Sequence, residues 1–344
     1  QLRKLHIDPG RVSGQHAFKI FDVNIHSVIQ KAVDLRQRLA TEIDGDDPAR
    51  NSAAKRRQLA QLHVVTSRLR KIADGVIAAG LPLGGKSGKA LDEAYENLRE
   101  AVKAQQESNG GDADSTWLDD IIDQGLTPTV TTDYKRWQPL HWVLEAPDVM
   151  VGRGGFDVIT GNPPFLGGKK VSSAMGLEIR EWLASVLGGG TKGSADLVAY
   201  FFLRALDLLA PHAGSLGLIA TDTIAQGDTR DVGLDQMVKS GFSITRAEQS
   251  RTWPATTATI RFASVWGTNG LVGHDAVKVA DGVAVEGIST FLEPPGGVGG
   301  KPIPLRQNVG ICHIGCYVMG TGFVVTGSEA ETWISQDPKN ANVL

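Results

Sequence analysis

A short segment near the middle of the chain carries the side chains best suited to chemistry. Residues 156–160 form an apolar run, and Gly161-Asn162-Pro163-Pro164-Phe165 follows it. The two prolines lack backbone N–H donors and restrict the residues before them, so a strand must end there. The Asn162 amide oxygen and the Pro163 carbonyl can accept both hydrogens of an amino group, and the exposed ring of Phe165 can stack on a flat molecule. The corner therefore predicts a site for a planar, amine-bearing ligand, with a proline-terminated strand in an ordinary loop as the alternative.

The segments around this corner predict the elements that position it. We expect strands at residues 156–160, 216–220, 243–249 and 259–266, and helices at 194–210 and 228–239, with Ser194 as an N-cap. This alternation is typical of a doubly wound α/β sheet, in which ligands bind beyond the carboxyl ends of the strands. The last two strands follow each other without a helix, which predicts an antiparallel hairpin at the edge of the sheet.

The residues upstream predict a large helical segment. Apolar residues recur at helical spacing in 22–44, in the segment after Asp47-Pro48, and in 86–108. The basic runs 55–57 and 68–71 fit the solvated faces of these helices, with nucleic-acid contact as the alternative. Downstream, residues 277–285 fold about Asp281-Gly282 and predict a β-hairpin.

Composition excludes several classes of protein. The 344 residues are 41% hydrophobic with a net charge of −3, which suits roughly two globular domains and does not itself predict nucleic-acid binding. The two cysteines, Cys312 and Cys316, exclude a disulfide framework and favour a reducing, cytoplasmic compartment. They lack a second pair of metal ligands, so no metal site is predicted. No apolar run approaches the length of a membrane span, and the first residue, Gln1, suggests a piece of a longer protein.

Several segments together resemble a known family. Gly161–Phe165 is similar to the N-P-P-[YF] motif of the adenine-N6 DNA methyltransferases found in type II restriction–modification and phage-defence systems. Asp196-Leu197 with 200–202 fits the D-L-x-x-x-F helix of that family, and residues 214–219 fit its next strand. Residues 224–227 fit a loop that often reads T-N-S-I-x-Q-G, although Asp222-Thr223 replaces Asn-Ser. Residues 253–254 and 320–323 also resemble family segments.

The resemblance implies a function and a set of site residues. It implies transfer of a methyl group from S-adenosylmethionine to the adenine amine of double-stranded DNA, with the target base flipped into the pocket. Asn162, Pro163, Pro164 and Phe165 would be the catalytic residues. Gly161 and Asp196 would contact the cofactor, although Asp196 at a helix start can instead interact with the helix dipole.

The resemblance also implies partners. Lys169 and Lys170, on a flexible loop, would contact phosphates, with solvation as the alternative, and Gln226 would contact DNA. Restriction or defence-system subunits are possible partners. We expect a partial Rossmann-like methyltransferase sheet at 151–269, a mainly helical segment at 1–150, and the start of a β-rich target-recognition region at 270–344.

One departure from the family pattern concerns the cofactor. The family's glycine loop, D-P-x-x-G-S-G, is matched only by residues 8–14, where Val12 replaces the central glycine. We therefore expect the true loop to precede Gln1, and the chain alone to bind S-adenosylmethionine poorly. Two alternatives remain open: a protein glutamine-N5 methyltransferase, which also uses an N-P-P-Y corner, and a catalytically incomplete DNA-binding fragment.

Overall fold

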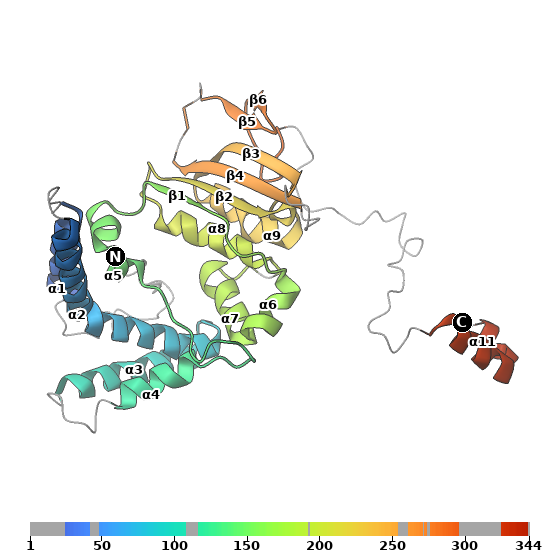
Figure 1. The fold of residues 1–344 in the computed structure, drawn as a ribbon, viewed down its shortest axis with the longest axis horizontal. Coiled ribbons are helices and arrows are strands. Elements are labelled where there is room, and N and C mark those ends of the chain that lie inside the picture. The colour runs from blue at the N-terminus through green and yellow to red at the C-terminus, as the bar shows by residue number, and fades with distance from the viewer. Residues whose placement is uncertain are drawn as a thin grey trace. The chain divides into compact units, whose positions relative to one another are not determined.

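The structure of the chain is a computed structural model, drawn as a ribbon in Figure 1. It describes residues 25–41, 48–107, 116–191, 193–253, 261–270, 272–273, 276–295 and 325–342. The chain divides into two compact units between Gly297 and Val298. The first unit contains the sheet and the long helices, and the described part of the second is a short helical segment.

Helices make up the amino-terminal part of the first unit. Their bounds are α1 (Ile25–Thr41), α2 (Pro48–Gly80), η2 (Leu81–Leu83), α3 (Lys89–Glu107) and α4 (Thr116–Leu126). Helices α2, α3 and α4 share a core of aliphatic side chains that includes Leu98, Leu118 and Leu126. The apolar stripes expected from the sequence largely face this core, although Leu59 is 42% exposed. The prediction of a helical segment upstream of the sheet is confirmed.

A six-stranded mixed sheet follows these helices. Its strands are β1 (Val158–Gly161), β2 (Ser215–Thr221), β3 (Phe242–Thr252), β4 (Arg261–Asn269), β5 (Lys278–Ala280) and β6 (Val283–Val285). Their order across the sheet is β1-β2-β4-β3-β5-β6. Strand β1 is parallel to β2, and β4 is antiparallel to both β2 and β3, so β1, β2 and β3 run in the same direction. The predicted α/β class is confirmed.

The position of β4 corrects two predictions. We expected the third strand to lie beside the second and the last two strands to form a hairpin at the edge, but β4 is inserted between β2 and β3. Its successive residues Ala263, Ser264 and Val265 are all buried. Burial of both faces is typical of a strand inside a sheet, whereas an edge strand usually exposes one face.

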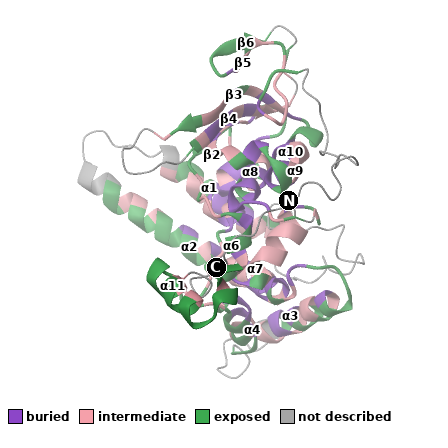
Figure 2. Ribbon diagram, turned by 90° about the vertical axis from the view of Figure 1, so that its right-hand side faces the viewer, coloured by how far each residue is buried: buried purple, intermediate pink, exposed green. Residues whose placement is uncertain are grey.

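Shorter helices connect and cover the strands. Their bounds are α5 (Trp142–Glu145), η3 (Asp148–Gly152), α6 (Gly168–Met175), α7 (Leu177–Trp182), η4 (Leu183–Leu187), α8 (Leu197–Leu208), η5 (Asp222–Ala225), α9 (Gly227–Val232) and α10 (Leu234–Lys239). Helix α8 packs against the sheet and is buried along most of its length (Figures 1 and 2). The single helix expected at 228–239 is divided in two at Gly233, whose φ of −86° and ψ of −93° interrupt the helix.

The hairpin at the far edge of the sheet agrees with its prediction. Strands β5 and β6 are antiparallel, and the turn residues Asp281 and Gly282 have φ values of 49° and 85°. Positive φ at both positions is the geometry of a type I′ turn, which Asp-Gly favours. Because β5 pairs with β3, the hairpin extends the sheet of the first unit. The start of a target-recognition region at residue 270 stays a prediction.

The described part of the second unit contains α11 (Gly327–Gln336) and η8 (Pro338–Asn342). Thr326 begins α11 with a capping box, in which its side chain and that of Glu329 bond each other's backbone amides. Residues 8–14 and 320–323, and the two cysteines, lie outside the described residues. Among the residues that the structure does describe, no helix has the length and apolar character needed to cross a membrane.

Candidate active site

The corner that follows β1 lies at the carboxyl edge of the sheet. Gly161, the last residue of β1, is in register with Leu218 of the parallel strand β2. Asn162 therefore begins its turn beside the end of β2, and the predicted location of the corner is confirmed. The Asn162 side chain is exposed and makes no hydrogen bond to any described residue, so its amide oxygen is free to accept one from a ligand.

Phe165 is less exposed than the sequence suggested. Its ring is only partly accessible and packs, with Leu166, against the core formed by α8 and the sheet. The reason is that the chain turns back toward the start of α8 directly after the two prolines. Part of the ring therefore fixes the corner to the core, and the predicted stacking on a base stays a prediction.

Asp196 holds the corner against the first turn of α8. Its carboxylate oxygen Oδ1 accepts hydrogen bonds from the backbone amides of Leu166 at 3.1 Å and Val198 at 3.0 Å. The Leu197 amide donates to the Leu166 carbonyl at 2.9 Å, so both backbone groups of Leu166 are bound at this helix end. Asp196 is the N-cap of α8, which corrects the prediction that Ser194 has this role. Cofactor contact by Asp196 stays a prediction.

Lys169 and Lys170 lie on a helix and not on the expected flexible loop. Helix α6 begins at Gly168, which places both lysines in its first turn with exposed side chains. Gly168 itself is buried, and a Cβ atom at this position would overlap the backbone oxygens of Ser194 and Ala195. Sequence reasoning missed this contact, for which the Gly167-Gly168 pair was the only indication. The DNA contacts of both lysines stay predictions.

The segment after β2 approaches the same edge and is linked to Asp196. Gln226 lies between η5 and α9 with an exposed side chain, and its contact with DNA stays a prediction. In the first turn of α9, Asp228 accepts the Ser194 amide at 2.7 Å and the Thr229 hydroxyl accepts the Asp196 amide at 3.1 Å. A continuous set of hydrogen bonds therefore joins the corner after β1 to the segment after β2.

The ends of β3 and β4 add groups at this edge that sequence reasoning did not identify. Arg251 lies near the end of β3 and Arg261 begins β4, and both side chains are at least half exposed or classed as exposed. Arg261 donates to the Ser250 carbonyl at 3.2 Å. The rings of Trp253 and Phe262 meet edge to face at 5.3 Å. Cations and aromatic rings thus accompany the corner on one edge of the sheet.

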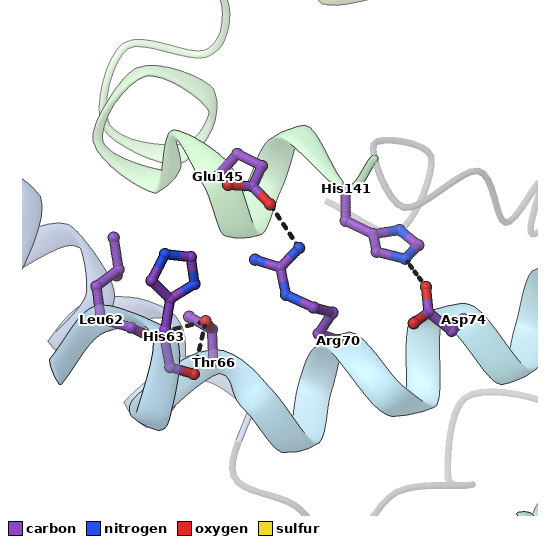
Figure 3. A network of polar contacts seen from close by, with 7 residues as sticks. All are labelled: Leu62, His63, Thr66, Arg70, Asp74, His141 and Glu145. Atoms are coloured by element: carbon purple, nitrogen blue, oxygen red, sulfur yellow. Dashed lines mark hydrogen bonds and ion pairs between the residues drawn. The ribbon is translucent and has the colours of Figure 1, made fainter. Parts of the chain in front are cut away.

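Polar contacts anchor the segment that leads into β1. Arg70 of α2 pairs with Glu145 of α5 at 2.5 Å, and Asp74 bonds the buried His141 at 2.8 Å (Figure 3). Lys71 pairs with Asp119 at 2.7 Å. Two cations of the basic run 68–71 are therefore used in contacts within the protein, which favours its structural interpretation.

The helix behind the corner carries a tyrosine in its buried face. Burial raises the pKa of Tyr200, Asp228 raises it further, and Arg180 opposes the shift. The Tyr200 phenol is therefore neutral near pH 7. Within the described parts of the chain, no cluster of three His, Cys, Asp or Glu side chains could hold a metal ion.

Comparisons with known proteins identify the family. The search of curated proteins gives no match. Among solved structures, the chain is similar at 15% identity and a TM-score of 0.42 to a chain of "Structure of Type IIL restriction-modification enzyme MmeI in complex with DNA has implications for engineering of new specificities". The match covers 72% of this chain and 33% of that chain, so this chain spans about a third of the length of the solved protein.

The family model that matches residues 47–242 is described as "Eco57I restriction-modification methylase". The match includes the helical segment from α2 onward, the corner after β1, and Asp196. It extends over more than half of the chain, and the chain therefore belongs to the Eco57I restriction-modification methylase family.

Proposed function

We propose that the protein methylates the N6 amine of adenine in DNA and that Asn162 and Pro163 bind the amine. The observation that carries the proposal is the exposed corner at the carboxyl end of β1, where the Asn162 side chain is free of contacts with described residues. An aromatic amine is a weak nucleophile because its lone pair is delocalised into the ring. Acceptors for both amine hydrogens favour a geometry in which the lone pair points away from the ring plane.

The methyl donor in this proposal is S-adenosylmethionine, which supplies an electrophilic methyl group when it is bound. Gly161 and Asn162 line a pocket of about 570 Å³ at the end of β1, and a Cβ atom at Gly161 would meet only Leu218, at 3.8 Å. The backbone here is open to close approach by a ligand, which suits the contact proposed for Gly161. The possible glycine loop at 8–14 lies outside the described residues.

The residues of the chain have distinct tasks in the proposed reaction. Asn162 and Pro163 would orient the amine, and Phe165, which Asp196 helps to position through Leu166, would contact the base. Lys169 and Lys170 project from the first turn of α6 and would contact phosphates. A flipped base needs such contacts because unstacking it costs a few kcal/mol.

The test uses the full-length protein, tritiated S-adenosylmethionine and unmethylated genomic DNA, which samples every short recognition sequence. The expected product is N6-methyladenine, identified by mass spectrometry of the digested DNA. We expect Asn162→Ala to lower the single-turnover rate by ~10²–10³-fold, the loss typical of one well-placed polar group. Phe165→Ala should instead weaken DNA binding, because base–aromatic stacking contributes about 1–3 kcal/mol, and Phe165→Tyr should be mild.

Other outcomes would contradict the proposal. Methylation of cytosine N4 would refute the choice of base, and label in a release factor and not in DNA would favour glutamine methylation. A single-turnover rate for Asn162→Ala within about threefold of the parent would refute the role of Asn162. DNA binding without methyl transfer would favour the catalytically incomplete fragment.

A further inference from the structure

The outer edge of β1 is free to pair with another strand. Among the described residues β1 pairs only with β2, and the Asp157 carbonyl accepts the Ser215 amide at 2.8 Å. Because parallel pairing uses alternate residues, the N–H and C=O groups of Val158 and Thr160 point away from β2. Val158 is 62% exposed. This edge therefore offers unsatisfied backbone groups in the geometry of a β-ladder.

The same side of the chain already pairs with another segment one step earlier. The Phe156 amide donates to the Leu208 carbonyl at 2.8 Å, and its carbonyl accepts the Ala210 amide at 2.8 Å. These two bonds form a parallel bridge between Phe156 and Leu209. Beyond Phe156, residues 208–210 turn away toward β2, and the edge is left open at Val158 and Thr160.

An apolar pocket runs along this edge. Its volume is about 570 Å³, and it extends from Trp142 and Phe156 to Asn162 and Pro163. Its walls are mostly apolar side chains of β1 and α8, among them Phe201, which is 42% exposed. An apolar surface of this kind favours an apolar occupant over a hydrated ion.

One cation interrupts the apolar walls. The Arg204 side chain on α8 is only 15% exposed, and its Nη2 atom is buried without a hydrogen-bond partner among the described residues. The nearest carboxylate is that of Asp207, 3.9 Å from Nη1 and itself 61% exposed. Burial lowers the pKa of Arg204, which shows that its charge is poorly compensated. A buried guanidinium is normally paired with an anion.

We propose that this edge binds an extended apolar peptide segment, which joins β1 as a strand and places one carboxylate against Arg204. The segment would satisfy the outward backbone groups of β1, fill the apolar pocket, and supply the missing anion. A free phosphate or a nucleic acid would leave the backbone groups unpaired and the apolar walls uncovered. The partner is therefore a protein segment that binds by β-strand addition.

The test is a selection of displayed nine-residue random peptides on the full chain. We expect the enriched peptides to be apolar with a single Asp or Glu. Asparagine or glutamine in place of that residue should weaken binding by at least about tenfold, as should Arg204→Met, since a buried charge pair loses much affinity when one partner is removed. Arg136→Met is the matched control, because Arg136 is 45% exposed, pairs with Asp123, and lies outside the pocket.

A backbone variant tests strand addition separately from the ion pair. Val158→Pro removes an N–H that points away from β2 and leaves the β1–β2 ladder intact, so peptide binding should be lost while the fold is kept. Thermal melting checks each variant, and if Val158→Pro does not fold, the Arg204 and peptide substitutions decide. Failure to enrich any peptide, enrichment without an acidic residue, or equal binding by Arg204→Met would overturn the proposal.

Discussion

The hydrogen bonds of Asp196 lead to a quantitative prediction about what holds the corner in place. A single carboxylate oxygen accepts the amides of Leu166 and Val198 at 3.1 and 3.0 Å, and Asp196 is 7% exposed. Asp196→Ala leaves both donors without this acceptor. Each unsatisfied buried donor costs about 1–3 kcal/mol, and the lost negative charge at the helix start costs a further ~0.3–1 kcal/mol.

We therefore expect Asp196→Ala to lower the free energy of unfolding by about 3–5 kcal/mol, a large part of the total stability of a typical protein. Asp196→Asn keeps an oxygen acceptor of the same size, and asparagine is a good N-cap. Its two hydrogen bonds become neutral ones, each weaker by roughly 1 kcal/mol, so a loss of about 1–2 kcal/mol is expected.

The assay is urea denaturation followed by tryptophan fluorescence, combined with hydrogen exchange at the Leu166 amide. An unchanged m-value would show that the variants differ in stability and not in the size of the transition. The Leu166 amide should exchange slowly in the parent and rapidly in Asp196→Ala. Asp123→Ala is the control, because Asp123 is 65% exposed and its pair with Arg136 is a surface one. The reasoning is refuted if Asp196→Ala destabilises the chain no more than this control.

Two further predictions concern packing and ionisation. Gly168→Ala should destabilise the chain by roughly 1–3 kcal/mol, because its Cβ would meet the backbone at Ser194 and Ala195, whereas Gly167→Ala has open space and should be nearly neutral in the same urea assay. Burial raises the pKa of Tyr95 to about 12, so stability should be constant below pH ~10 and fall as the pH rises toward 12, where the unfolded state loses the phenol proton first. Tyr95→Phe should reduce this alkaline loss in unfolding experiments between pH 8 and 11, and an unchanged pH dependence would show that Tyr95 is not its source.

Local patterns in the sequence determined several features of the protein. Two consecutive prolines cannot continue a strand, so the end of β1 and the corner at Asn162 followed from residue types alone. Helical spacing identified the stripes of α1, α2 and α3, because one face of each must be buried. Asp281-Gly282 predicted the hairpin turn, since these residues tolerate the positive φ that such a turn requires.

Tertiary contacts decided the features that these patterns leave open. Alternation of apolar residues specifies a strand but not its neighbour, so only the structure placed β4 between β2 and β3. Ser194 and Asp196 are both good N-caps by residue type, and Asp196 has this role because its carboxylate also meets the Leu166 amide from thirty residues earlier in the sequence. The buried guanidinium of Arg204 and the contact of Gly168 likewise depend on groups distant in sequence, whose approach is a property of the packed chain.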